Sequence, residues 1–450
     1  MTDTNELKVP KRVLNQLLAA LSAGVVPRMG TPYIAIGRNE EIATLLDTLD
    51  QVGEGGASVR FLIGRYGSGK SFLIQLIRGY AMERGFLCAD ADLSTDQRRL
   101  CGGNGAGLAT YRELLRNLSS KASPDGGALP VVLSRHYALL LQDLFADGIT
   151  ADSPNFCEAL KKRVVEEFAS LEGGVGGFDF ARVLVEYFLA CASDNEERKS
   201  ACLRWLRGEY STKTEAKAQL GFSVSGIIDD ESWYDFIKLW SRFARYVGYK
   251  GLVVYIDECI ILYKIVNRVS RESNYEKILT IFNDTLQGRA EGLCVVFGGT
   301  PQFLEDTRRG LFSYEALKSR LTDSRFSDAG YRVLSSPVIR LRRLSDNELY
   351  ALLTRLARLY AMQNPSAPVL SDEENREFLS QSLRRTGAQE LITPREIIRD
   401  YLTLLDILRD NPTATFSGVL SAHIPKETPD QGGTAGGAPV SHVTLSDIDF

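Results

Sequence analysis

The stretch GRYGSGKS, residues 64–71, has the spacing G-x-x-x-x-G-K-S that is typical of a phosphate-binding loop. An apolar strand pattern, SVRFLIG, comes before it, and an amphipathic helix pattern follows it. Glycines allow backbone amides to approach phosphate oxygens that a side chain would keep away. We expect Lys70 to reach the β- and γ-phosphates and the Ser71 hydroxyl to bind Mg²⁺.

This loop predicts a site for a nucleoside triphosphate, with ATP and Mg²⁺ as the expected cofactors. A chance match in an ordinary strand–helix turn is the alternative, and the flanking strand and helix patterns argue against it. The N-terminus of the following helix adds positive potential for phosphate. The residues assigned to nucleotide binding in this stretch are Gly64, Arg65, Tyr66, Gly67, Ser68, Gly69, Lys70, Ser71 and Phe72.

Two acids end the most apolar strand pattern of the chain, GLVVYIDE at 251–258. Open α/β sheets bind ligands at the carboxyl ends of their strands, so both side chains are expected at that edge. We expect Asp257 to hold Mg²⁺ through a water molecule and Glu258 to orient and polarise the attacking water. A strand that simply ends at solvent is the alternative, and the phosphate loop makes it the weaker interpretation.

Further polar residues could complete such a site. Thr300 ends the strand pattern LCVVFGGT, where its hydroxyl could sense the γ-phosphate or simply belong to a turn. Arg308, Arg309 and Arg320 are candidates for an arginine that acts on the ATP of a neighbouring subunit, and a solvated charge is the alternative for each. Arg395 begins a helix pattern in the C-terminal region and could contact the γ-phosphate.

Nine basic residues occur between Arg308 and Arg343. Three interpretations stay open for them: a nucleic-acid track, a subunit interface that faces ATP, and a solvated face. The net charge of −4 argues against a basic field over the whole molecule. The three tryptophans are interpreted as core residues rather than as platforms for nucleic-acid bases, and they are Trp205, Trp233 and Trp240.

Alternating strand and helix patterns predict an α/β fold, a P-loop parallel sheet with helices on both faces. The interval between Lys70 and Asp257 is far longer than one strand–helix–strand unit needs. We therefore expect a mostly helical insertion at about 95–245, turn-rich over 95–130, with a partner-binding or regulatory role. The expected divisions are 1–30 for an N-terminal helix and lead-in, 31–334 for the ATPase core with its insertion, 335–423 for a C-terminal helical lid, and 424–450 for a flexible linker and terminal peptide.

From about residue 335 the pattern is helical only. Two helix starts there carry capping boxes, in which a Ser or Thr is followed three residues later by Glu. The first box joins Ser345 to Glu348, and the second joins Thr393 to Glu396 with Pro394 at the first helical position.

Composition narrows the class of protein. An apolar content of 44% and a charged content of 24% are ordinary for a soluble globular chain with a large core. Seven cysteines without a C-x-x-C pair and three histidines argue against a zinc site and suit a reducing cytoplasm. The N-terminus is too polar for a signal peptide, and no apolar run is long enough to span a membrane. We expect a cytoplasmic protein with no membrane partner.

The order of the segments GRNEEI, GRYGSGKS, YIDE, FGGT, LKSRL and TPRE resembles an AAA+ ATPase, closest to the initiator (origin-recognition) branch and its prokaryotic relatives. In that branch the segment matching GRNEE cradles the adenine. Thr300 departs from the asparagine often found at its position. The roles that this resemblance implies are Gly37 and Arg38 near the base, Asp257 and Glu258 as the Walker B pair, Thr300 as sensor 1, Arg320 as an arginine finger, and Arg395 as sensor 2.

A narrower resemblance covers roughly residues 8–410. The strings VPKRVLNQL, GVVPRMGTPYIAIGR, RFLIGRYGSGKSFLIQLIR, ADADLS and ATYRELLRNL are similar to bacterial ATP-binding proteins found with BREX-type bacteriophage-defence systems. Such proteins are often encoded beside a helicase of the DEAD or Swi2/Snf2 kind. The resemblance implies a defence context and a helicase or another DNA-processing protein as partner.

These observations support three hypotheses. The first is an AAA+ ATPase, a homo-oligomer that hydrolyses ATP to switch or drive a DNA-processing antiviral complex. The second is an adaptor that binds ATP for assembly, turns it over slowly and recruits a partner through the insertion and the C-terminal peptide. The third is an initiator-like protein that binds double-stranded DNA directly, for which the basic stretch at 308–343 is the support.

Overall fold

The structure is a computed structural model that describes residues 8–168, 176–322, 336–384 and 393–422. The chain divides into two compact units. The sheet unit comprises residues 40–65 and 77–340, and the helical unit comprises residues up to 39, residues 66–76 and residues from 341 onward. The linker and peptide expected at 424–450 lie outside the described residues, as does part of the basic stretch at 308–343.

A five-stranded parallel sheet forms the centre of the sheet unit, with the strand order β2-β3-β4-β1-β5. All residues of β3 and β4 are buried, as expected for inner strands of a parallel sheet that is covered on both faces. This confirms the expected α/β fold with a parallel sheet. The strands are β1 (Ser58–Ile63), β2 (Leu87–Asp92), β3 (Leu252–Asp257), β4 (Leu293–Gly299) and β5 (Val338–Arg340).

The edge strand β5 corrects the expectation that the chain is only helical from about residue 335. Val338, Ile339 and Arg340 instead pair in parallel with Phe61–Ile63 of β1. A strand of three residues carries too little pattern to be recognised by itself, and it is defined by the pairing partner that β1 offers.

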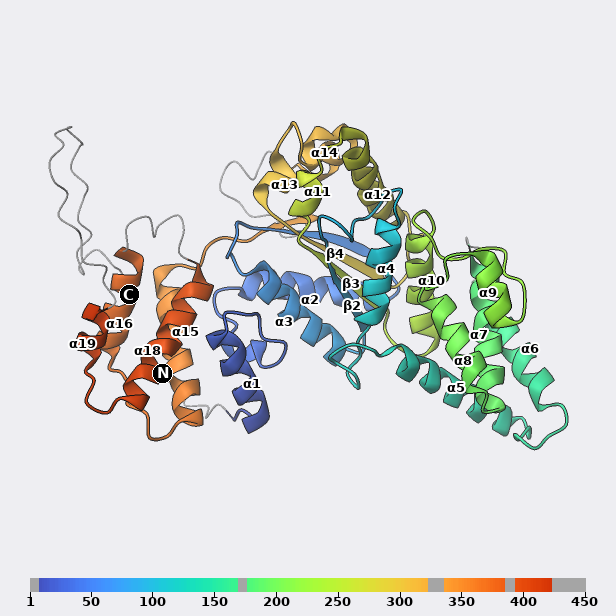
Figure 1. Ribbon diagram of the computed structural model, residues 1–450, viewed down its shortest axis with the longest axis horizontal. Helices are drawn as coiled ribbons and strands as arrows, with labels where there is room; N and C mark the ends of the chain where they lie inside the picture. Colours follow the sequence, from blue (N-terminus) through green and yellow to red (C-terminus); the bar gives the residue numbers. More distant parts are fainter. Residues whose placement is uncertain (1–7, 169–175, 323–335, 385–392, 423–450) are drawn as a thin grey trace. The chain divides into compact units, whose positions relative to one another are not determined.

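Helices pack against the strands of the sheet unit (Figure 1). Helix α12 packs on β1, α10 on β3 and α4 on β2. Short helices follow the carboxyl ends of β3 and β4, so they begin at the sheet edge where ligands bind in open α/β folds. The helices outside the insertion are α2 (Asn39–Gly53), α3 (Lys70–Glu83), α11 (Ile260–Lys264), α12 (Arg268–Leu286), α13 (Pro301–Glu305) and α14 (Glu315–Leu321).

The long interval between β2 and β3 is mostly helical, as expected. Its first helix corrects the expectation of a turn-rich start, because Ala106–Arg116 lies between two glycine-rich turns and forms a regular helix. The helices of this insertion are α4 (Ala106–Arg116), α5 (Leu129–Ala146), α6 (Phe156–Phe168), α7 (Gly177–Ala192), α8 (Glu196–Leu206), α9 (Lys213–Leu220) and α10 (Trp233–Tyr246).

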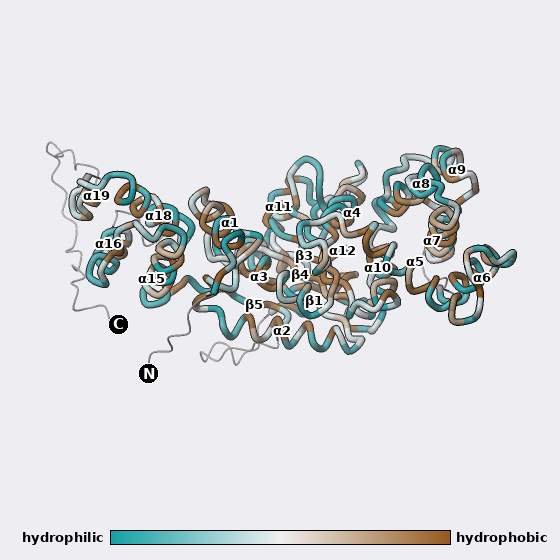
Figure 2. Tube along the Cα trace, turned by 90° about the horizontal axis from the view of Figure 1, so that it is seen from below, coloured by the Kyte–Doolittle hydropathy of each residue, from teal (hydrophilic) through white to brown (hydrophobic). Residues whose placement is uncertain are grey.

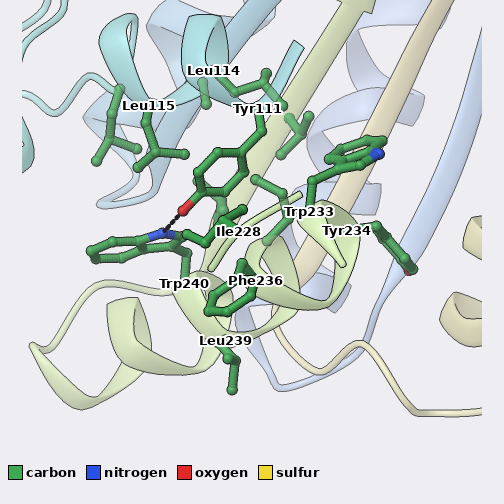
Figure 3. Packing of buried hydrophobic residues seen from close by; sticks show 14 of the residues in the cluster. Tyr111, Leu114, Leu115, Ile228, Trp233, Tyr234, Phe236, Leu239 and Trp240 are labelled. Carbon is green, nitrogen blue, oxygen red and sulfur yellow. Dashed lines mark hydrogen bonds between the residues drawn. The ribbon is translucent and has the colours of Figure 1, made fainter. Parts of the chain in front are cut away.

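Buried aromatic side chains connect helices of the insertion (Figure 3). The Trp240 indole donates to the Tyr111 hydroxyl over 2.9 Å, and that hydroxyl donates to the Leu206 carbonyl over 2.6 Å. The Trp233 indole donates to the Leu100 carbonyl. Each buried polar atom of these rings therefore has a partner, which burial requires. All three tryptophans are buried, so their interpretation as core residues is confirmed.

The helical unit has a separate leucine-rich core. Helix α1 (Lys11–Ser22) buries one face against α15 (Asp346–Gln363) and α18 (Pro394–Asp410), and Figure 2 shows the hydrophobic residues along it. Both predicted capping boxes are confirmed, at the starts of α15 and α18. Among its described residues this unit also contains α16 (Asp372–Arg384), α19 (Phe416–Ala422) and the short 3-10 helix η1 (Thr31–Ile34).

Candidate nucleotide-binding site

The glycine-rich loop leaves β1 at Ile63 and enters α3 at Lys70. Gly67 and Gly69 have φ angles of +76° and +87°, a backbone conformation in which any other L-residue would be strained. The first turn of α3 is closed by a hydrogen bond from Leu73 N–H to the Gly69 carbonyl. Since the first amides of a helix have no partner within the helix, the loop ends in a group of donors suited to an anion.

One buried polar atom of the loop lacks a hydrogen-bond partner that a ligand would supply. The Ser68 side chain is buried, with 6% of its surface exposed, and its hydroxyl has no hydrogen-bond partner among the described residues. A buried hydroxyl without a partner is costly, so its retention is expected where a bound group supplies the missing hydrogen bond. The loop conformation and this hydroxyl together fit a bound phosphate chain.

The first turn of α18 lies against the loop within the helical unit. A Cβ atom added to Gly67 would lie 2.2 Å from Cγ2 of Thr393, the N-cap residue of α18. Arg395, which is predicted to contact the γ-phosphate, stands in this same helical turn and is exposed. Its aliphatic stem lies about 3.9 Å from the position of a Cβ on Gly24. The γ-phosphate contact remains a prediction.

Gly37 and Arg38 are placed beside the loop rather than apart from it. The Arg38 guanidinium is buried and donates to the Ser68 carbonyl over 2.8 Å. Gly37 has a φ of +72°, and a Cβ there would lie 2.5 Å from the Glu348 carboxylate. Arg38 therefore contacts the loop, and the contact of Gly37 and Arg38 with the base stays a prediction.

The carboxyl edge of the sheet collects the acidic residues. Strand β4 lies between β1 and β3, with Ile63 paired to Gly299 and Ile256 paired to Phe297. The Gly64 amide donates to the Gly299 carbonyl over 3.1 Å, so the first residue of the loop lies at this same edge. The pairing of parallel strands thus gathers the start of the loop, the end of β4 and Asp257 within one unit.

The two acids of YIDE differ in their surroundings. Asp257 is buried, with 7% of its surface exposed, and its Oδ1 accepts a hydrogen bond from the Glu258 amide over 2.8 Å. Glu258 is exposed and has a φ of +57°, an uncommon backbone conformation for a residue other than glycine. An immobilised carboxylate next to an accessible one suits the predicted division between a Mg²⁺ ligand and a base acting on water.

A third acid, Asp92, was overlooked in the sequence. It ends β2 and pairs with Asp257 across the parallel ladder. Partial loss of its water shell, together with the nearby Asp257, raises the pKa of Asp92 to about 6, even though the side chain remains open to solvent. The sequence contains a signal for Asp92, because ADAD ends a strand pattern in an acid as YIDE does. Parallel strands have their carboxyl ends at a common edge of the sheet, which brings such acids together.

Among the described residues no group of three or more His, Cys, Asp or Glu side chains is arranged to hold a metal ion. Mg²⁺ in phosphate sites needs fewer, since it keeps several waters and takes one or two protein oxygens together with phosphate oxygens. The buried carboxylate of Asp257 and the Ser71 hydroxyl at the start of α3 are of this chemical type.

Thr300 caps helix α13, because its hydroxyl accepts a hydrogen bond from the Phe303 amide over 3.3 Å. This contact supports the turn interpretation, and the role in sensing phosphate stays a prediction. Of the arginine candidates, Arg309 lies over the Tyr263 ring and donates to the Ile265 carbonyl, which are contacts within its own unit. Arg308 is exposed, and so is Arg320, which donates to the Ala316 carbonyl of α14.

The chain matches the family model for the BREX system ATP-binding protein BrxC/D over residues 9–423. The chain belongs to this family. BrxC/D membership confirms the resemblance to BREX-associated ATP-binding proteins and indicates an ATP-binding role in phage defence. A comparison with curated proteins found no match. In the parts of the chain that the structure describes, every helix is too short or too polar to cross a membrane.

Removing the Ser68 hydroxyl is expected to weaken ATP binding without lowering stability. The hydroxyl has no partner among the described residues, so Ser68→Ala breaks no protein hydrogen bond described here. A lost bond to a charged phosphate should weaken binding about tenfold or more. Titration with a fluorescent ATP analogue, together with thermal unfolding, measures both effects.

The matched control is Ser119→Ala, since the Ser119 hydroxyl is buried and bonded to Arg78 and to the Asn117 carbonyl. That variant should lose stability and keep its affinity for ATP. Unchanged ATP affinity in Ser68→Ala would show that the hydroxyl does not contact nucleotide.

Replacing Asp92 by Asn is expected to stabilise the protein above pH 6. The raised pKa means that the folded state disfavours the ionised form of Asp92. The contribution of Asp92 to the free energy of unfolding is therefore fully present below its ordinary pKa near 4, and it is lost as the pH rises through about 6. Thermal unfolding from pH 4 to 8, without Mg²⁺ or nucleotide, should therefore show a gain for Asp92→Asn at pH 8 that vanishes near pH 4.

The control for this experiment is Asp96→Asn, at an exposed acid on the following segment. A pH-independent effect of Asp92→Asn would mean that neither the loss of water nor the neighbouring carboxylates raise the pKa of Asp92 in the folded state.

Proposed function

We propose that this BrxC/D chain is an AAA+ ATPase that binds and hydrolyses ATP to switch or drive a DNA-processing antiviral complex. One observation carries the proposal. The phosphate-loop sequence begins at the carboxyl edge of the sheet, where Gly64 donates to Gly299 of β4, and Asp257 ends β3 at this same edge with Glu258 directly after it. A triphosphate-binding loop and a pair of acids at one edge of a parallel sheet are the parts that ATP hydrolysis requires.

The proposed roles follow from the chemistry of each group. Lys70 would bind the β- and γ-phosphates, and Ser71 together with Asp257 would hold Mg²⁺, which would neutralise charge on the phosphates when bound. Glu258 would accept a proton from the attacking water, since its carboxylate is accessible beside the buried Asp257. Hydrolysis to ADP and phosphate is the activity proposed.

The helical unit would supply a further contact to the phosphates bound in the loop. Its first α18 turn lies against the loop glycine Gly67, which supports Arg395 as the residue that contacts the γ-phosphate. Arg320 would act on the ATP of a neighbouring copy, because its guanidinium is exposed on a short helix of the sheet unit. This arrangement requires a homo-oligomer.

The partner proposed is a helicase or another protein of the defence system, with the helical insertion as its docking element. Direct binding of double-stranded DNA has less support, because several arginines of the 308–343 stretch have contacts within the chain. Arg340 pairs with Glu305, Arg342 pairs with Glu348, and Arg309 is held at Tyr263.

An ATP-dependent adaptor with slow turnover is the second candidate function. The observation that favours it is the capping bond of the Thr300 hydroxyl, which engages the proposed γ-phosphate sensor with its own helix. Tight ATP binding with negligible turnover, with or without DNA and at all protein concentrations, would favour this adaptor over the ATPase.

Two substitutions separate binding from hydrolysis. Lys70→Ala should abolish ATP binding, since it removes the cation from the phosphates. Glu258→Gln should keep the affinity within about twofold and lower turnover by roughly 10²–10⁴, the contribution of a general base. Equilibrium binding and phosphate release, measured across protein concentrations with and without duplex DNA, test both; wild-type turnover in Glu258→Gln would refute the assignment of the base.

The arginine finger is tested by mixing inactive variants. Arg320→Ala should lose on the order of 10³-fold in turnover. An equimolar mixture of Arg320→Ala with Glu258→Gln should regain activity, because the Glu258→Gln copies still carry the arginine and can supply it to the intact catalytic acids of the Arg320→Ala copies. Arg308→Ala, at a neighbouring exposed arginine, is the control and should retain activity. A mixture no more active than its components would exclude Arg320 as a finger supplied between copies.

A further inference from the structure

Arg38 is a buried cation held by backbone carbonyls. Only 4% of its surface is exposed. Its Nη2 donates to the Ser68 carbonyl over 2.8 Å and to the Arg342 carbonyl over 2.6 Å. A buried guanidinium is tolerated only where its N–H groups find acceptors, and these two carbonyls are such acceptors. All three residues belong to the helical unit.

The two carbonyls that accept from Arg38 belong to two different segments, the phosphate loop and the connection from β5 to α15. Ser68 lies in the phosphate loop, next to Gly69, where the loop turns into α3. Arg342 lies in the segment that connects β5 to α15, the first helix after the sheet. One planar side chain therefore joins the loop to the start of the C-terminal helices. The planar guanidinium fixes the directions of both N–H groups of Nη2, which the freely rotating ammonium on the flexible stem of a lysine does not.

The connection continues through side chains to α15. The Arg342 guanidinium forms a two-pronged pair with the Glu348 carboxylate. Glu348 also accepts a hydrogen bond from the Ser345 amide over 2.8 Å and so closes the capping box of α15. These bonds to Arg342 and Ser345 hold the pKa of Glu348 down at about 2, so the pair stays ionised at neutral pH.

The backbone at Gly37 brings Arg38 into this arrangement. Its φ of +72° turns the chain beside Glu348, and a Cβ there would lie 2.5 Å from the carboxylate carbon. Gly37 thus allows the chain to pass the Arg342–Glu348 pair while Arg38 reaches the loop. The sequence GR at 37–38 is accounted for by these contacts, without a contact to a nucleotide base.

We propose that Arg38 is a positioning residue that links the phosphate loop to the start of α15, so that the loop holds its phosphate-binding form while residues 342–348 are in place. This inference rests on the proposed function, since it needs a phosphate chain in the loop. It differs from a base contact in a measurable way. A residue that shapes the loop affects every ligand carrying a phosphate chain, whereas a base contact affects ATP selectively.

The experiment measures binding of ATP, GTP and inorganic tripolyphosphate by displacement of a fluorescent ATP analogue. Arg38→Lys should weaken all three by a similar factor, about tenfold, as expected for coupling between two segments. Glu348→Gln, placed at the far end of the connection, should weaken binding in the same uniform way. The double variant should bind no more weakly than Arg38→Lys alone, because both substitutions break one connection.

Glu374→Gln is the matched control. Glu374 closes the same kind of box at the start of α16 with Ser371, and no contact between this box and the loop is described. It should leave binding unchanged, and thermal unfolding should show that every variant is folded. The inference is overturned if Arg38→Lys weakens only ATP, if the two losses add, or if Glu374→Gln acts as Glu348→Gln does.

The wild-type protein separates this inference from the proposed function. Failure of the wild type to bind ATP would overturn the proposed function and the inference with it. Normal binding by the wild type together with normal binding by Arg38→Lys would overturn the inference alone.

Discussion

The parallel pairing of β1, β4 and β3 is the constraint on which the candidate site depends. These strands are parallel and paired in register, so their carboxyl ends lie at one edge of the sheet. A residue of the candidate site lies at or directly after the end of each strand. The start of the phosphate loop, the cap of α13 and the acids of β3 meet there without any of them being close in sequence. The parallel pairing also explains why Asp92 lies beside Asp257, since the last residue of β2 pairs with the last residue of β3.

The sheet carries a large helical insertion without loss of this register. Leu87 of β2 pairs with Leu252 of β3 even though α4–α10 intervene between the two strands. Helices α4 and α10 pack on β2 and β3, and the Tyr111–Trp240 hydrogen bond joins them. The first and last helices of the insertion thus contact each other beside the strands. We expect that the lengths and sequences of α5–α9 can change without a shift of the acids at the sheet edge.

Local signals explain what could be predicted from the sequence. The phosphate loop, the strand ending in two acids and both capping boxes are each contained in a few consecutive residues, and those elements were predicted at the right positions. Elements defined by distant partners were missed. Strand β5 depends on β1, and the hydrogen bonds of Arg38 are made to carbonyls 30 and 304 positions away in the chain. Neither partner can be read from neighbouring residues.

The helical unit is assembled from segments at opposite ends of the chain. Helix α1 buries Leu14, Leu17 and Leu18 in a core that α15 and α18 complete. At a ribosome that adds roughly 5–20 residues per second, α1 emerges tens of seconds before α18 is made. During that time the leucines of α15 and α18 that cover its apolar face are not yet present, and the unit has the high sequence separation of contacts that slows folding. Synthesis of this protein therefore includes a period in which the apolar face of α1 is not yet covered by α15 and α18.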